Sequence, residues 1–446
     1  MRAGRVTTGA RRRSAPARAA LALLLVALSA LTACGGSGSG PVVHILGTWT
    51  GDEQKSFLAV VAPFERRTGI RVDYQGSPDA ATVLADRVAS GSPPDLAVLS
   101  SPGQLAPYAR AGRLTPLDGV LDRAALNAQY SPSWLQLGAV DGRQFAVVVK
   151  ASLKSLLWYS PRALAAHGWT PPATWDQLTA TDRQITAAGG TPWCVGLEAS
   201  SASGWPGTDW LEDIVLAQSG PDVYDQWVAG KLAWTSAPIR LAWQTWGAVV
   251  AAAGQVRGGP RGMLQTSFGA GGGYLLADRP ACYFDHEASF ITGYYRRSTP
   301  QGGAPGAPPP KAGQDFAFSR FPTITPAFSG DEEIGGDLLG LFHDTPAARQ
   351  LLDYLTAPEA QGSWVSRGGT LSPNRQVPAT AYPDDLTHQL GQLLADAPAV
   401  RFDASDLMPD ALRDAFYQAV LAYVSDPSQL DTLLTDLDRV RATVQP

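Results

Sequence analysis

Histidine and cysteine are scarce in this sequence, and the common motifs of metal and nucleophile sites are missing. The 446 residues include five histidines and three cysteines. The chain has no H-E-x-x-H, no C-x-x-C and no G-x-S-x-G, so it lacks familiar zinc-ligand and serine-nucleophile patterns. We therefore expect no bound metal and no cofactor.

The cysteines divide into one near the N-terminus and two in the body of the chain. Cys34 ends the sequence LTAC, and Cys194 and Cys282 remain as an even pair. An even pair in an exported protein favours a disulfide, although two buried free thiols are the alternative.

Only one apolar run is long, and it lies at the start of the chain. Six arginines precede the apolar stretch 19–33, which is typical of a secretory signal over residues 1–33. LTAC matches a lipobox, so we expect Cys34 to be lipidated and 34–40 to form a flexible tether. An ordinary signal peptide is the alternative, and the arginine pair leaves general secretory and twin-arginine export open. No second run could span a bilayer, so a membrane-tethered protein is expected.

The remaining 413 residues are acidic. Without residues 1–33 the sequence has 29 basic and 40 acidic residues, a formal charge of −11. Nucleic acid needs a basic footprint and is excluded as a partner. This length exceeds one core and predicts two domains.

Strand and helix patterns alternate at the start of the mature chain. The order β-α-β-α-β predicts a parallel sheet with right-handed crossovers. Ligands of such sheets bind beyond the carboxyl ends of the strands, where the loops 47–53 and 100–104 lie. The predicted strands are 42–46, 70–74 and 95–99, and the predicted helices are 54–69, with a kink at Pro63, and 77–91, with Ser77 as N-cap.

Later segments contain clearer signals for where strands, helices and loops begin and end. The β-rich stretch 145–159 is long enough to cross between two domains. Thr174 and Gln177 have capping-box spacing, which predicts a helix from about Trp175. The other predictions are an exposed Pro/Gly-rich loop over 299–313, a helix from 346 to 356, and two amphipathic helices within 408–444.

Two loop-like stretches combine tryptophan with acids. GTWTGDE holds Trp49, Asp52 and Glu53, and GWPGTDWLED holds Trp205, Asp209 and Trp210. Indole rings stack on sugar C–H faces, while carboxylates accept hydrogen bonds from sugar hydroxyls. The competing interpretation of the first stretch is a solvated helix N-terminus.

Other residues near these stretches have different expected roles. We expect Gly204 and Pro206 to be turn residues, and Glu212 and Asp213 to form the acidic first turn of the following helix. In YFDHEASF the neighbours Asp285, His286 and Glu287 alternate in direction on a strand, so a polar ligand contact is favoured over catalysis. Core packing is expected of Trp158, Trp175, Trp243 and Trp246.

Several motifs together resemble a known family. GTWTGDEQKSFLAVVAPFERRTGIRVDY and SPPDLAVLSSPGQLAPYARAGRLTPLD resemble the start of a bacterial extracellular solute-binding protein of family 1. CVGLEASSASGWPGTDWLED, CYFDHEASFITGYY and GGDLLGLFHDTPAARQLLDYLTAPEAQGSW resemble its alpha-glucoside-binding subgroup. The resemblance covers residues 41–446.

The resemblance implies an α/β, two-lobe periplasmic-binding-protein-like fold of type II, with a sugar in the cleft and three chain crossings. The N-lobe would comprise 41–149 plus 288–337, and the C-lobe 150–287 plus 338–446. The expected partners are a small sugar and the permease of an ABC importer, and the protein is expected to be a monomer without catalysis. The implied ligand-binding residues are Trp49, Asp52, Glu53, Ser100, Ser152, Lys154, Trp205, Asp209, Trp210, His286, Glu287, Asp337, Trp364 and Arg367.

Two alternatives remain open from the residues alone. A secreted glycoside hydrolase could use Asp209 with Glu287 or Glu53, which requires two carboxylates about 5–9 Å apart across one bond. A binding lipoprotein for a non-sugar solute is the other alternative, although the candidate loops are acidic and lack the convergent arginines that phosphate ligands need.

Overall fold

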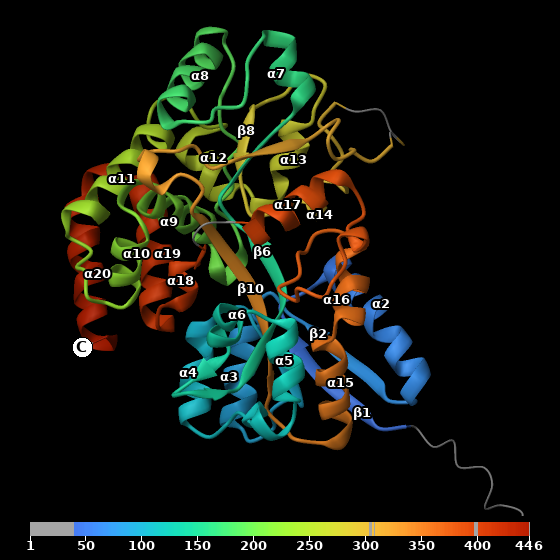
Figure 1. The fold of residues 1–446 in the computed structure, drawn as a ribbon. Helices are drawn as coiled ribbons and strands as arrows, with labels where there is room; N and C mark the ends of the chain where they lie inside the picture. Colours follow the sequence, from blue (N-terminus) through green and yellow to red (C-terminus); the bar gives the residue numbers. More distant parts are fainter. Residues whose placement is uncertain (1–39, 303–305, 307, 397–399, 446) are drawn as a thin grey trace, which may run out of the picture. The chain divides into compact units, whose positions relative to one another are not determined.

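The N-terminal sheet follows the alternating pattern of the sequence. A computed structural model describes residues 40–302, 306, 308–396 and 400–445. Strand β1 pairs in parallel with both β2 and β3, so the predicted β-α-β-α-β unit is confirmed (Figure 1). Its elements are β1 (Val42–Gly47), α2 (Gly51–Thr68), β2 (Arg71–Gly76), α3 (Ala80–Ala89) and β3 (Leu96–Leu99).

Three further strands complete this sheet from distant parts of the sequence. β10 (Glu332–Leu341) runs antiparallel to β3 and to β6 (Ala146–Leu153), while β11 (Val400–Phe402) pairs with the start of β10. The order is β11-β10-β3-β1-β2, with β6 attached to β10. The register of β6 and β10 shifts between Asp337 and Leu338, where the strand passes the site described below.

A second, three-stranded antiparallel sheet has the order β8-β7-β9. Its strands are β7 (Leu156–Tyr159), β8 (Phe284–His286) and β9 (Ala317–Arg320). β6 and β7 together cover most of the β-rich stretch 145–159, and residues 154–155 separate them. The next elements in the chain are α7 (Pro161–His167), α8 (Trp175–Ala187), α9 (Trp205–Ser219), α10 (Pro221–Val228), α11 (Ala237–Val250), α12 (Gly259–Gln265), α13 (Gly271–Leu275) and α14 (Ile291–Tyr295).

Tryptophan dominates the core beside the second sheet. Trp227, Trp243 and Trp246 are buried there against Phe416 and Tyr423 of the C-terminal helices. The predicted pair of amphipathic helices is confirmed, as α19 (Asp410–Ser425) and α20 (Leu430–Val444). The remaining elements are α4 (Leu105–Arg110), α5 (Arg123–Gln129), α6 (Pro132–Leu137), β4 (Ala139–Val140), β5 (Arg143–Gln144), α17 (Asp385–Asp396) and α18 (Ala404–Leu407).

The packing groups the chain differently from the lobe boundaries given above. Helices α15 (Pro346–Thr356) and α16 (Pro358–Val365) share a core with Val43 and Phe57 of the first sheet. β9, which falls within the residues 288–337 assigned above to the N-lobe, pairs with β7 in the second sheet. Side-chain packing between distant segments decides which core or sheet each of these elements joins. The order of elements in the sequence does not reveal that packing.

Local signals agree with the structure in most places. Thr174 Oγ1 accepts from the Gln177 amide at 3.3 Å, and α8 begins at Trp175 as predicted. The helix predicted over 346–356 is confirmed. Ser77 is not the N-cap of α3, because a turn at 78–79 delays the helix to Ala80 with Asp79 before it. Pro63 lies within α2, and the helix continues through it to Thr68.

The predicted disulfide is confirmed. Cys194 and Cys282, 88 residues apart in sequence, are joined and buried beside Leu275 and Trp158. None of the helices in the described part of the chain is apolar over a bilayer-spanning length. The signal segment and Cys34 lie outside the described residues.

Candidate functional site

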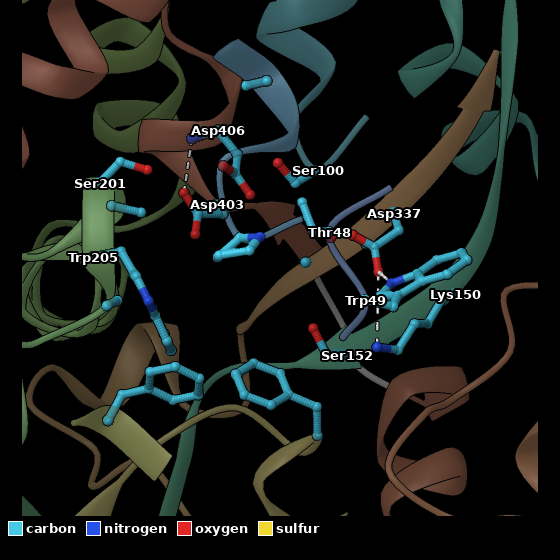
Figure 2. A pocket seen from close by; sticks show the side chains of 18 of the residues that line it. Thr48, Trp49, Ser100, Lys150, Ser152, Ser201, Trp205, Asp337, Asp403 and Asp406 are labelled. Carbon is cyan, nitrogen blue, oxygen red and sulfur yellow. Dashed lines mark hydrogen bonds and ion pairs between the residues drawn. The ribbon is translucent and has the colours of Figure 1, made fainter. Parts of the chain in front are cut away.

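A cavity of about 450 Å³ lies where many distant segments of the chain meet. The β1–α2 turn, the start of α3, strands β6 and β10, the start of α9 and the segment around α18 all contribute to its lining. Figure 2 shows Trp205 on one side of this cavity and Trp49, Asp337 and Lys150 on the other. We call this space the main cavity. Its volume lies within the range of about 300–1,000 Å³ that is typical of small-molecule sites.

On the β1 side of the main cavity, one ammonium pairs with two carboxylates. The Lys150 ammonium lies 2.5 Å from Glu53 Oε1 and 3.8 Å from Asp337 Oδ2. Trp49 Nε1 donates to Asp337 Oδ2 at 2.8 Å. Burial raises the pKa of Asp337, while Lys150 and Trp49 oppose that rise. Glu53 and Asp337 raise the pKa of Lys150 although its burial acts the other way. This side is therefore a fixed polar network.

Trp49 belongs to both the core and the cavity wall. Its ring packs on Phe57, Tyr74 and Trp364, and only 2% of the residue is exposed. Little of its face is left for stacking on a ligand. The main contribution of Trp49 to the main cavity is therefore its indole N–H, which donates a hydrogen bond to Asp337 and holds that carboxylate in place.

The hydroxyl groups of Ser100 and Ser152 line the main cavity. Ser100 follows β3, and Ser152 lies in β6. Among residues 40–302, 306, 308–396 and 400–445, neither hydroxyl has a hydrogen-bond partner. Both are available to donate to, or accept from, a polar ligand.

Trp205 forms the aromatic wall at the first residue of α9. Gly204 precedes it with φ 111°, and a Cβ there would lie 2.5 Å from the Tyr417 carbonyl oxygen. Only glycine allows this close turn, which holds the indole at the cavity. The ring contacts Phe268 and Phe290, with centroids 5.1 and 5.9 Å away. The turn role expected for Gly204 is confirmed, and Pro206 lies in the first turn of the helix.

The acids that follow Trp205 are buried and do not line the cavity. Asp209 Oδ1 accepts from Lys154 Nζ at 2.8 Å, and the same ammonium contacts the Asp403 carboxylate. Burial raises the pKa of Asp209 to about 7, with Lys154 acting against that rise. Lys154 lines the cavity above them, with its ammonium 5.5 Å from the Trp205 ring centre. Asp209 therefore acts on the cavity through Lys154.

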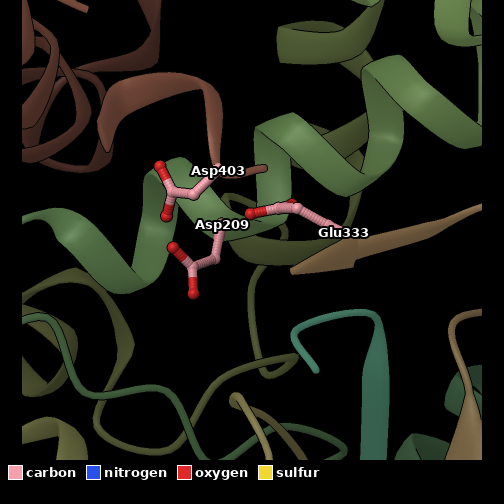
Figure 3. A group of neighbouring side chains, drawn as sticks. All are labelled: Asp209, Glu333 and Asp403. Atoms are coloured by element: carbon pink, nitrogen blue, oxygen red, sulfur yellow. The ribbon is translucent and has the colours of Figure 1, made fainter. Parts of the chain in front are cut away.

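Glu333 joins Asp209 and Asp403 in a buried carboxylate group (Figure 3). One oxygen of each lies within 4.8 Å of the others. Burial raises the pKa of Glu333, and the neighbouring carboxylates raise it further. The Lys154 ammonium forms ion pairs with two of the three carboxylates, those of Asp209 and Asp403.

Glu212 and Asp213 are not in the first turn of α9, and that expectation was wrong. The helix begins earlier, at Trp205, so both acids lie in its second and third turns with at most 2% exposure. Glu212 accepts from the amides of Ala404 and Ser405. Ser155 donates its hydroxyl to Asp213.

Three further candidates lie in the interior behind the main cavity. His286 Nε2 and Asp213 Oδ2 are 2.8 Å apart, and the Trp210 ring lies 4.4 Å from the imidazole. Glu287 is 2% exposed, and burial raises its pKa. None of Trp210, His286 and Glu287 lines the cavity. A hydrolase using Asp209 with Glu287 would have both carboxylates buried away from this space.

The last three candidates surround a second, smaller cavity. Asp52, Trp364 and Arg367 line a space of about 270 Å³ next to the main one, which we call the side cavity. Asp52 pairs with Lys55 at 2.7 Å and with Arg297 at 3.1 Å. Asp52 and Glu53 lie in the first turn of α2, so the helix N-terminus that competed with the loop interpretation is present.

Several residues that line the main cavity were missed from the sequence. Asp403 caps α18 and accepts from the Asp406 amide, a pattern that the spacing of the two acids in DASD could have indicated. Burial raises the pKa of Asp406, and Asp403 adds to the rise. No sequence signal marked the others, Phe268, Phe290, Tyr294, Arg413 and Tyr417.

Comparison with known proteins identifies the family. Residues 48–271 match the family described as bacterial extracellular solute-binding protein. The osmoprotective compounds-binding protein GgtB of Synechocystis sp. is 35% identical, over 92% of this chain and 96% of its own length. The alpha-glucosides-binding periplasmic protein AglE of Rhizobium meliloti is 31% identical, over 88% and 85%.

Solved structures agree on the fold. The bacterial solute receptor AcbH superposes with a TM-score of 0.77 at 16% identity, covering 91% of this chain and 100% of that one. The expected α/β periplasmic-binding-protein-like fold is thereby confirmed. The chain belongs to the bacterial extracellular solute-binding proteins, a family that binds solutes for ABC importers and does not catalyse reactions.

Proposed function

We propose that this protein binds a sugar, most specifically an alpha-glucoside, in the main cavity and delivers it to an ABC-importer permease. The observation that carries the proposal is the pairing of an aromatic wall at Trp205 with the hydroxyls of Ser100 and Ser152, which have no hydrogen-bond partner among the described residues. Sugars present apolar C–H faces and rings of hydroxyls, so this pairing is complementary to them. Asp406, whose pKa is raised, adds a carboxyl group to the same space.

The relatives support this ligand class by name. AglE is named for alpha-glucosides, and GgtB for osmoprotective compounds. An alpha-glucoside, which is uncharged, agrees with the first name and with the charges around Lys150 already being paired within the protein. An osmoprotectant outside the sugars is the second candidate, favoured by the 35% identity to GgtB.

We further propose that two lobes close over the ligand. The first sheet with α15 and α16 would form one lobe, and the second sheet with the tryptophan-rich core the other. The hydrogen bond from Ser201 to Asp79, both at the main cavity, would join the lobes across its edge. The binding free energy would then favour the closed arrangement.

We place the protein outside the cytoplasmic membrane, anchored through a lipidated Cys34. The proposal rests on the basic region, the apolar run and the lipobox of residues 1–34. Metabolic labelling with a fatty acid analogue tests it, because Cys34→Ala should abolish incorporation of the label.

Thermal-shift screening of the purified protein tests the ligand class. A ligand that binds only the folded state raises Tm, by an amount that grows with concentration above Kd. We expect maltose, sucrose or trehalose to raise Tm, and glycine betaine and proline to leave it unchanged. A shift with betaine alone would favour the second candidate and contradict the first.

A further inference from the structure

Glu333 is a buried acid whose side chain has no partner in the described part of the chain. It lies near the start of β10 and is fully buried. Among residues 40–302, 306, 308–396 and 400–445, neither of its carboxylate oxygens has a hydrogen-bond partner. Burying a carboxylate without a hydrogen bond or a counter-charge is costly, so such a group indicates a ligand that the protein side chains do not supply.

The main chain holds Glu333 in a fixed position. Its amide donates to Ser155 Oγ at 2.6 Å, and its carbonyl oxygen accepts from the Lys154 amide at 2.8 Å. These bonds attach the start of β10 to the two residues that separate β6 from β7. In Figure 3 the Glu333 side chain extends toward Asp209 and Asp403. The backbone therefore directs this carboxylate at the other two.

The three carboxylates are close enough to share one ion. One oxygen from each lies within 4.8 Å of the others. Two oxygens on opposite sides of a calcium ion are about 4.6–5.2 Å apart, because each Ca–O distance is about 2.3–2.6 Å. The three acids come from separate segments, with Asp209 in α9, Glu333 in β10 and Asp403 directly before α18. One cation at this point can join all three segments.

Lys154 uses only part of the capacity of these acids. Its ammonium binds Asp209 Oδ1 and contacts the Asp403 carboxylate. In the part of the chain that the structure describes, Asp209 Oδ2 has no hydrogen-bond partner, and the same holds for both Glu333 oxygens. When all three acids are ionised, they and Lys154 have a formal charge of −2. A divalent cation matches that charge.

The chemistry and burial of the ligands favour calcium among the divalent cations. The three acids offer only carboxylate oxygens, which hard cations prefer, whereas zinc sites are built mainly from nitrogen and sulfur. Each of the three acids is at most 2% exposed. Magnesium usually keeps several of its waters, while calcium accepts protein oxygens in a flexible geometry. Asp403 and Lys154 also line the main cavity, which gives an ion a route to the acids.

We propose that Asp209, Glu333 and Asp403 bind one calcium ion, which joins α9, β10 and the segment before α18 next to the main cavity. The ion supplies the positive charge that Lys154 alone does not, and it stabilises the folded chain. This proposal departs from the sequence-based expectation of no bound metal, which rested on missing histidine and cysteine motifs. It does not depend on which solute the protein binds.

Calorimetric titration of calcium chloride into the purified, chelator-stripped protein tests the proposal. We expect one ion per chain with a Kd below about 1 mM, the weak limit for calcium sites of extracellular modules. Because the ion binds the folded state, calcium should also raise Tm by an amount that grows with its concentration. Magnesium chloride at the same concentrations should raise Tm less.

Glu333→Gln removes one charged ligand and keeps the shape of the side chain. It should weaken calcium binding by about tenfold or more, because ligand charge sets the affinity of such sites. In chelator its Tm should be no lower than that of the wild type, since the substitution removes a buried charge without a partner. Asp182→Asn is the matched control, because Asp182 is equally buried but binds Trp193 outside this group. This control should keep the wild-type affinity for calcium.

Three results would overturn the proposal. They are no heat and no change of Tm when calcium is added to the wild type, equal calcium affinities of the wild type and Glu333→Gln, and an equal loss of affinity in Asp182→Asn. Should Glu333→Gln fail to fold, anomalous diffraction from wild-type crystals grown with calcium replaces it. A peak between the three carboxylates would support the site, and peaks only elsewhere would overturn it.

Discussion

The Lys154 ammonium lies 2.8 Å from Asp209 Oδ1, in the interior beneath the Trp205 ring. Both side chains are less than a tenth exposed. Asp403 contacts the same ammonium, so one cation serves two buried carboxylates. The ammonium lowers the pKa of Asp403 against the effect of burial, opposes the rise that burial causes in the pKa of Asp209, and lies below the aromatic wall of the main cavity.

Removing the ammonium should destabilise the fold strongly. Lys154→Met leaves Asp209 and Asp403 buried without their cation, which we expect to lower the free energy of unfolding by about 3–5 kcal/mol. Denaturation in urea measures the change. Lys55→Met, which breaks the exposed pair with Asp52, should cost at most about 1 kcal/mol and serves as the control.

A double variant separates charge burial from packing. Asp209→Asn removes one of the two carboxylates that Lys154 serves, so the double variant Lys154→Met/Asp209→Asn should be more stable than Lys154→Met alone. Strictly additive losses in the two single variants would contradict the coupling.

Asp182 should make stability depend on pH. Burial raises the pKa of Asp182 to about 7 from the ordinary value of 3.8. Between these values the folded protein holds a proton that the unfolded chain releases, so the free energy of unfolding falls as pH rises through this window and levels off above it. Asp182→Asn removes this loss, and its stability relative to the wild type should improve by about 2–3 kcal/mol between pH 5 and pH 8.

The pH prediction has a matched control on the same helix. Asp176→Asn, at an exposed position of α8, should differ from the wild type by the same amount at both pH values. A constant difference for Asp182→Asn as well would show that Asp182 is not the group responsible.

The disulfide should contribute stability and leave binding unaffected. Cys194 and Cys282 close a long loop, so Cys194→Ser/Cys282→Ser should lower the free energy of unfolding by about 2–5 kcal/mol. Neither cysteine lines the main cavity, and ligand affinity should stay at the wild-type value. Added reductant should lower Tm of the wild type and have no effect on the double variant.

The sequence predicts best where the signal is local. The first βαβ unit, the cap at Thr174 and the C-terminal helix pair depend on neighbouring residues, and all three were found. The position of Ser100 at the main cavity also follows from a loop at a strand end, and that of Trp205 from a glycine turn, whereas Ser152 within β6 was indicated by the family resemblance alone.

The predicted site residues that do not line the main cavity share one physical cause, which is burial by distant segments. Asp209, Trp210 and Glu287 have residue types that suit a sugar, but Lys154, His286 and the core around them bury these side chains. The role of Asp403 depends on its approach to Lys154 across 249 positions of sequence. No local pattern encodes such a contact.

The most direct test of the central claim is calorimetric titration of an alpha-glucoside, taken from the thermal-shift screen, into the wild type and Trp205→Ala. The lost ring contact should weaken binding by about 1–3 kcal/mol without lowering the free energy of unfolding by a comparable amount. Trp169→Ala, a half-buried tryptophan that stacks on His167 away from the cavity, should bind as the wild type does. Equal affinities of the wild type and Trp205→Ala would contradict sugar binding in the main cavity.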